Sequence, residues 1–163
     1  MRMLATLLCA LVSLSACGLQ PMYAGGGNGA VARGLSQVEV SEIPGRAGWL
    51  VRNALQDRLG AAGEGTTRYR LDVRLDDDLE GLGVLNDDTI SRERRILRAR
   101  YQLVDIFSEE IVLDATAGSD AGIDVVSSEY ATIAAEQTAL ENLAREIADR
   151  MVAQVALTLR EDA

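Results

Sequence analysis

The chain has 163 residues, a net charge of −9 and 48% hydrophobic residues, of which few are aromatic. This length suits one domain of ordinary size with a core of aliphatic side chains. The sequence contains no histidine, and all 16 of its basic residues are arginine. Histidine is the usual acid–base residue near neutral pH and lysine serves Schiff-base and P-loop chemistry, so the composition argues against an enzyme. The net negative charge argues against binding of nucleic acid.

The first residues have the proportions of a bacterial signal peptide. A short positive segment, Met1–Met3, precedes an apolar run from Leu4 to Leu14, which is shorter than the about 20 residues of a membrane-spanning helix. The ending Leu14-Ser15-Ala16-Cys17 resembles a lipobox, in which the leader is removed before the cysteine and the cysteine receives acyl chains. We therefore predict a signal peptide over residues 1–16 and lipid attachment at Cys17. The alternative is an ordinary signal peptide that is cut elsewhere.

Lipidation of Cys17 limits the chemistry of the mature chain. Cys9 lies in the predicted leader, so the mature protein has no free thiol for a disulfide or a metal site. Several acyl chains give stable membrane anchoring where one chain is marginal. Gly18, and not aspartate, follows the cysteine, and the resemblance to sorted lipoproteins implies an outer-membrane location on the periplasmic side. The glycine-rich run Ala24–Gly34 predicts a flexible tether, so that residues 17–36 carry the lipid and the tether and residues 37–163 form the folded domain.

Hydrophobic periodicity predicts the secondary structure of this domain. The expected elements, in chain order, are a strand over Val38–Ile43, a helix over Gly48–Leu59, a strand over Thr67–Leu75, a loop over Asp76–Asp88, a strand over Ser91–Val104, a turn over Asp105–Glu109, a strand over Ile111–Ala117 and a helix from Ser127 or Ser128 to Leu159. The apolar stripe of the last helix holds Ile133, Leu140, Ala144, Ile147, Met151 and Val155. The order β-α-β-β-β-α predicts an α+β fold: a two-layer sandwich with a four-stranded sheet and two helices on one of its faces.

Arginines occupy the polar positions of two of these strands, and strand side chains alternate between faces. The positions are Arg68, Arg70 and Arg74 on one strand and Arg92, Arg94, Arg98 and Arg100 on the other. If the apolar positions lie under the helices, these arginines line the open face and could bind phosphate or carboxylate groups. The alternative is that they pair with cross-strand acids such as Asp72, Asp76 and Asp114 and only keep the sheet soluble.

The predicted loop combines acidic and apolar residues. Its acids, Asp76–Asp78 and Asp87–Asp88, lack the spacing and the central glycine of an EF-hand, so we expect no metal site and no cofactor. Its apolar residues Leu79, Leu82, Val84 and Leu85 are unusual for a loop. They indicate either packing over the sheet edge or contact with a partner.

Three segments of the sequence resemble one known protein family. Cys17-Gly18-Leu19-Gln20-Pro21-Met22-Tyr23 resembles the start of mature proteins of the LptE family, the lipoprotein subunit of the lipopolysaccharide-assembly translocon, although Leu19 stands where the family usually has an aromatic residue. Ile43-Pro44-Gly45-Arg46 leading into the helix Trp49–Leu59, and the arginine-rich strand through Tyr101-Gln102-Leu103, are also similar to the family. The order of the predicted elements fits as well.

This resemblance implies a partner and a role. LptE-like proteins sit inside the large β-barrel of LptD at the outer membrane, plug it, assist its assembly and bind lipopolysaccharide. We therefore expect a non-catalytic subunit with an LptD-like barrel and lipopolysaccharide as partners. The strand positions select Arg92, Arg94, Arg98 and Arg100 as candidate residues for binding the anionic glycolipid. The alternative function is an accessory lipoprotein of another envelope lipid-transport system.

Overall fold

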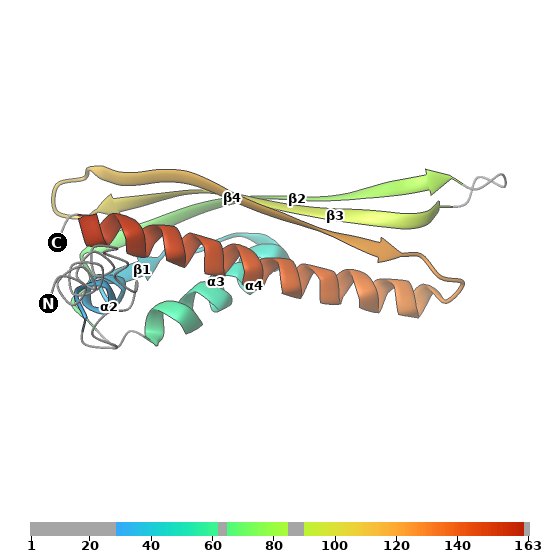
Figure 1. The fold of residues 1–163 in the computed structure, drawn as a ribbon, viewed down its shortest axis with the longest axis horizontal. Helices are drawn as coiled ribbons and strands as arrows, with labels where there is room; N and C mark the ends of the chain where they lie inside the picture. Colours follow the sequence, from blue (N-terminus) through green and yellow to red (C-terminus); the bar gives the residue numbers. More distant parts are fainter. Residues whose placement is uncertain (1–28, 62–64, 85–89, 162–163) are drawn as a thin grey trace, which may run out of the picture.

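The structure, a computed structural model, describes residues 29–61, 65–84 and 90–161. Its elements are α2 (Ala30–Leu35), β1 (Val38–Val40), α3 (Gly45–Gly60), β2 (Tyr69–Val84), β3 (Ile90–Asp105), β4 (Ile111–Asp124) and α4 (Glu129–Glu161). The molecule is an elongated two-layer sandwich in which the helices lie on one face of the sheet (Figure 1). The predicted α+β fold and the order of its elements are therefore confirmed, with one additional helix, α2, at the start.

The sheet has the strand order β1-β2-β3-β4. The short β1 runs parallel to β2 and pairs only with its first residues, from Tyr69 to Leu71. The strands β2, β3 and β4 pair antiparallel in chain order along almost their whole length. Because these three strands are long antiparallel neighbours, the sheet is stretched out along the axis of α4 (Figure 1).

Aliphatic side chains from both layers form the core. The largest fully buried ones are Leu55 and Val51 of α3, Leu71 of β2, Leu97 and Leu103 of β3, and Ile147, Met151 and Val155 of α4. Burial of each such side chain contributes about 1.5–3 kcal/mol. Buried aliphatic side chains thus form the core in place of aromatic ones, and they lie on the face of the sheet that the helices cover.

The strands are longer than the sequence predicted. Residues 76–84 continue β2 along β3, so the predicted loop is wrong over this range, and β4 continues from Ala117 to Asp124. The acidic run interrupted the apolar alternation and suggested a loop, but Asp77 is held by an ion pair with Arg95 of β3. The first strand ends at Val40, before the predicted Ile43, although Ile43 is buried.

A helix replaces part of the predicted tether. Ala30–Leu35 forms α2, and Val31 and Leu35 are buried in the core cluster that also holds residues of α4. A Cβ on Gly34 would lie 3.2 Å from Leu159 Cδ1, which shows how closely the two helices approach. Burial of these apolar side chains outweighs the low helix propensity of glycine. The prediction of a tether is wrong from Ala30 onward, while residues 1–28, including the predicted leader and Cys17, lie outside the described residues.

The last helix agrees with its predicted bounds to within two residues. Its first turn begins after Ser128, whose carbonyl accepts the N–H groups of Ala131 and Thr132. The predicted apolar stripe is buried except at Ile133, which is 42% exposed. No described helix is long and apolar enough to cross a membrane.

Candidate functional site: the charged open face of the sheet

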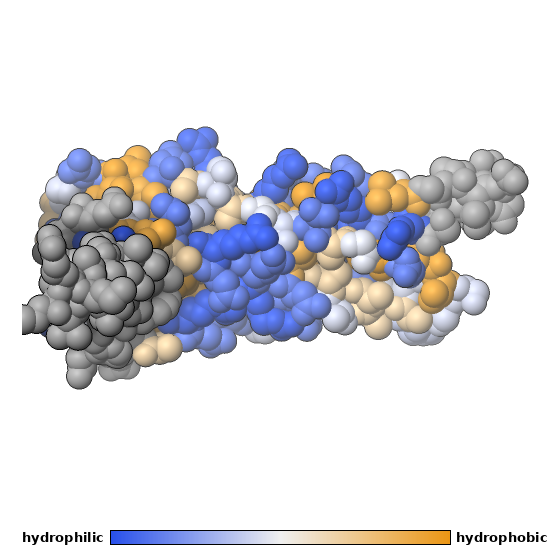
Figure 2. All heavy atoms as spheres, in the orientation of Figure 1, coloured by the Kyte–Doolittle hydropathy of each residue, from blue (hydrophilic) through white to orange (hydrophobic). Residues whose placement is uncertain are grey.

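The alternation of side chains along β2 and β3 places the arginines on the uncovered face. On β3, Leu97, Ala99, Tyr101 and Leu103 are buried beneath the helices, and all four candidate arginines, Arg92, Arg94, Arg98 and Arg100, are exposed. Tyr69, Leu71 and Val73 of β2 are buried in the same way. Figure 2 shows hydrophilic residues along the outer side of the sheet. We call the uncovered side of β2, β3 and β4 the open face.

Three of the four candidate arginines pair with aspartates of β4. Arg92 lies 3.3 Å from Asp124, Arg94 lies 3.1 Å from Asp120 and Arg100 lies 3.1 Å from Asp114. Arg100 donates two hydrogen bonds to Asp114, and Gln102 donates a third at 2.8 Å. The hydrogen bond from Arg100, followed by that from Gln102, lowers the pKa of Asp114. These contacts bear out the interpretation of cross-strand pairing at three positions.

The open face therefore carries both charges instead of the positive patch expected from the arginines alone. The sequence placed only part of β2 and β4 in strands, and their additional residues bring further acids to this face. The carboxylates that share the face with the arginines are Asp72, Asp76, Asp78, Glu80, Asp114, Asp120 and Asp124. A ligand anion must consequently bind at a local excess of arginine and cannot be held by the face as a whole.

Such a local excess exists near the middle of the sheet. Arg74 of β2 lies directly opposite Arg100 of β3, and Arg98 follows two residues away on the same face. The guanidinium groups of Arg74 and Arg98 form no ion pair or hydrogen bond with another described residue, although Asp76 stands opposite Arg98 in the register. We call Arg74, Arg98 and Arg100 the arginine cluster. The guanidinium groups of Arg74 and Arg98 can therefore donate hydrogen bonds to a ligand without giving up a contact with another described residue.

The cluster borders a shallow hollow. A depression of about 510 Å³ is lined by the three arginines together with Asp76, Thr116 and Gly118. Gly118 faces Arg98 across the strands, and a Cβ built on it would lie 3.4 Å from Arg98 Cγ. The missing side chain leaves room for the Arg98 stem over β4. Guanidinium groups around such a hollow can hold a phosphate or carboxylate by bidentate hydrogen bonds.

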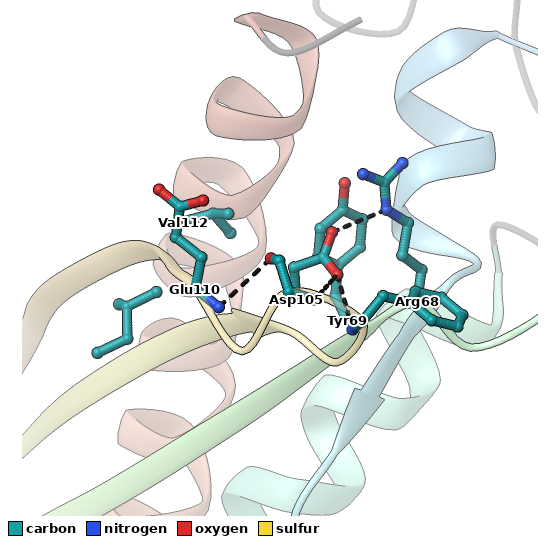
Figure 3. A pocket seen from close by; sticks show the side chains of 8 residues that line it. Arg68, Tyr69, Asp105, Glu110 and Val112 are labelled. Atoms are coloured by element: carbon teal, nitrogen blue, oxygen red, sulfur yellow. Dashed lines mark hydrogen bonds and ion pairs between the residues drawn. The ribbon is translucent and has the colours of Figure 1, made fainter.

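Arg68, the residue before β2, contacts a different part of the structure, the turn between β3 and β4. Its Nε donates to Asp105 at 3.0 Å, and its guanidinium lies 5.1 Å from the centre of the Tyr69 ring (Figure 3). Asp105 also accepts the N–H groups of Phe107 at 2.9 Å and Ser108 at 3.3 Å. These contacts, with the bond from Phe107 contributing most, lower the pKa of Asp105. The hollow of about 870 Å³ beside this turn is thus bordered by side chains that fix the turn.

Among the residues that the structure describes, no group of three acids, histidines or cysteines could hold a metal ion, and Asp87–Asp88 lie outside them. Leu79 and Leu82 are 45% and 40% exposed, so they do not pack over the sheet edge. Leu85 lies outside the described residues.

The candidate set omitted Arg74, the third member of the arginine cluster. Its polar position on the strand was visible in the sequence, but only the register shows that it stands beside Arg100. Likewise, Asp120 and Asp124 could be recognised as partners only once β4 was known to extend past Ala117.

Known structures share this fold. A lipoprotein from Caulobacter crescentus CB15 aligns with a TM-score of 0.69 and 26% identity, covering 83% of this chain and 98% of its own. The minor lipoprotein of Acinetobacter baumannii aligns with a TM-score of 0.59 and 15% identity over 75% of this chain and 92% of that one. The rare lipoprotein B of Shewanella oneidensis aligns with a TM-score of 0.55 and 15% identity, covering 77% of this chain and 96% of its own. No curated protein sequence matches the chain.

The family model for LptE, described as lipopolysaccharide-assembly, matches residues 35–155. The match runs from the end of α2 through most of α4 and so contains every strand of the sheet and the whole open face. The protein accordingly belongs to the LptE family of lipopolysaccharide-assembly lipoproteins.

Proposed function

We propose that this protein is the lipoprotein subunit of an outer-membrane lipopolysaccharide translocon. Anchored on the periplasmic side through acyl chains on Cys17, it plugs an LptD-like β-barrel, assists the assembly of that barrel and binds lipopolysaccharide. The family match supports the role in lipopolysaccharide assembly. The lipobox-like ending of the leader supports the anchor.

The arginine cluster is the observation that carries the proposal of glycolipid binding. Lipopolysaccharide presents phosphates and acidic sugars, and charge-assisted hydrogen bonds from guanidinium groups suit both. Among the four candidate arginines, Arg98 ranks first because, like Arg74, it gives up no ion pair with a described residue on binding. Arg92, Arg94 and Arg100 must exchange an aspartate for the ligand, so each contributes less to the net free energy of binding.

Binding of purified lipopolysaccharide to the full chain in detergent tests this site. Replacing Arg92, Arg94, Arg98 and Arg100 together with glutamate weakens binding and leaves the fold intact. Arg98→Glu alone lowers the affinity about tenfold or more, because a charge-assisted hydrogen bond is worth about 1.5–3 kcal/mol. Arg46→Glu is the matched control, since Arg46 is exposed at the start of α3 and carries the same charge change. Unchanged binding by Arg98→Glu and by the quadruple variant would refute the glycolipid site.

Co-purification tests the barrel partner. The tagged protein, extracted from outer membranes in gentle detergent, should carry a large β-barrel in fixed stoichiometry. A lipidated and folded protein that carries no barrel would point instead to an accessory role in another lipid-transport system.

A further inference from the structure

The outer edge of β2 is open along most of its length. β1 pairs only with Tyr69–Leu71, and the last bond on this side runs from the Ser41 N–H to the Leu71 carbonyl at 3.1 Å. From Val73 to Leu82, no described strand lies on this side of β2. The outward N–H and C=O groups belong to alternate residues, and this series continues from Leu71 through Val73, Leu75, Asp77, Leu79 and Gly81. An unpaired row of this kind is a template for an added strand.

At the opposite edge of the sheet, side chains of α4 contact the edge strand β4. At β4, Arg150 of α4 donates a hydrogen bond to the Gly118 carbonyl, and Ser119 Oγ donates to Glu146 of α4 at 2.8 Å. Side chains of α4 therefore contact the middle of β4, and one of them occupies a backbone carbonyl there. The helix α3 and β1 cover only the start of β2, so its distal part projects beyond both (Figure 1).

The acidic side chains along the open edge of β2 indicate which kind of strand could pair with it. Asp76, Asp78 and Glu80 are exposed on the open face, and none of them lies within ion-pair distance of another described residue, although Asp76 stands opposite Arg98 and Glu80 opposite Arg94. Asp77, on the opposite side of the strand, is already paired with Arg95. An added strand would bring every second side chain next to these three carboxylates, where lysine or arginine is favoured.

The other side of the same edge is apolar. Leu75 is partly buried against the core, and Leu79 is 45% exposed on the side of the sheet that faces the helices. Apolar surface is visible at this end of the sheet in Figure 2. The remaining side chains of an added strand would cover these leucines. The edge therefore matches a segment that alternates basic and apolar residues.

We propose that Val73–Leu82 of β2 binds an extended basic–apolar segment of a partner protein as a fifth strand. A second copy of this chain does not fit, because pairing of β2 with itself would set acids against acids. The inference concerns the edge of the sheet and stands apart from the glycolipid site on its face. Its outcome is also independent of whether the barrel co-purifies.

A ten-residue peptide that alternates arginine and valine tests the proposal with the full chain in detergent. The fluorescent peptide should bind with a saturable change in anisotropy, and a peptide with glutamate in place of arginine should not. At saturation, hydrogen exchange should slow at least about tenfold at the outward amides of Val73, Leu75, Leu79 and Gly81, because each then has a hydrogen-bond partner. Binding without this protection would overturn the added strand.

Two triple variants with the same change in net charge test whether the peptide binds at the edge of β2 or only through the overall charge of the protein. Reversal at the edge, Asp76→Arg with Asp78→Arg and Glu80→Arg, should lower the affinity for the arginine peptide at least about tenfold and favour the glutamate peptide. The control, Asp57→Arg with Glu129→Arg and Glu141→Arg, changes exposed helix acids and should stay within about twofold. Equal losses in both variants would refute a site at the β2 edge.

A third variant removes a backbone donor. Leu79→Pro deletes one outward N–H and obstructs pairing at that point, so peptide binding should be lost. The charge-reversal pair remains decisive if this proline unfolds the strand.

Discussion

Arg95 and Asp77 form a two-pronged ion pair on the covered side of the sheet. Nε of Arg95 lies 2.8 Å from one carboxylate oxygen of Asp77, and Nη2 lies 2.7 Å from the other. Nη1 donates to the Glu136 carbonyl of α4 at 3.3 Å, so one side chain connects β2, β3 and the helix. Both side chains are at least three-quarters buried, which protects the pair from solvent screening.

Loss of this connection should loosen the start of α4. In Arg95→Leu we expect faster hydrogen exchange at α4 residues 131–138, corresponding to about 1–3 kcal/mol of local stability, because the pair and the helix contact are removed together. Residues near Met151 should keep their protection. Asp77→Asn, which keeps the size of the side chain, should give a smaller change in the same direction. Uniform acceleration along α4 would contradict a local role.

Two glycines of α3 should respond oppositely to alanine. At Gly48, a Cβ would lie 2.4 Å from the Ile43 carbonyl oxygen, and backbone cannot yield as a flexible side chain can. Gly48→Ala should destabilise the protein by more than about 2 kcal/mol. At Gly60 a Cβ would meet nothing within 4 Å, so Gly60→Ala should stabilise by about 0.5–1 kcal/mol. Urea unfolding of both variants checks the pair, and similar values for the two would refute the steric argument.

The turn after β3 should make stability depend on pH. The backbone N–H of Phe107, Arg68 and the N–H of Ser108 lower the pKa of Asp105 in the folded protein. Its contribution is therefore complete above the unfolded pKa of about 3.9 and is lost as pH falls through the lower folded value.

Urea unfolding of the wild type and of Asp105→Asn between pH 7 and pH 2.5 measures this contribution. The variant should be less stable at pH 7, and the two curves should converge at low pH. The pKa values of Asp114 and Asp149 are also lowered, by Arg100 and Arg58, so only the difference between the two proteins isolates Asp105. A difference that stays constant with pH would show that the carboxylate charge is not what holds the turn.

The arginine cluster should lower stability in the absence of a ligand. Arg74 and Arg100 are direct cross-strand neighbours with like charge, which is unfavourable. Arg74→Glu should raise Tm slightly in low salt, and the gain should shrink at high salt. The same variant should weaken lipopolysaccharide binding. A fall in Tm with unchanged binding would contradict a role for this pair in holding an anion.

The sequence by itself determined the layers of this protein. Period-2 alternation at Tyr69–Leu75 and Leu97–Leu103 decided which side chains are buried, because successive residues of a strand must point to opposite faces. The helical spacing of Leu140, Ile147 and Met151 determined the buried stripe of α4 in the same way. The arginines of β3 were consequently placed on the open face correctly from their positions alone.

Only the tertiary structure decided the charge of that face and the extent of the elements. Pairing with β3 holds Asp76–Asp78 in a strand, and burial of Val31 and Leu35 holds α2 despite Gly34. Register, which depends on contacts between residues far apart in the chain, brought Asp120 to Arg94 and set Arg74 against Arg100. Local propensity cannot contain this information, since the stabilising partners of each residue lie on another strand or helix.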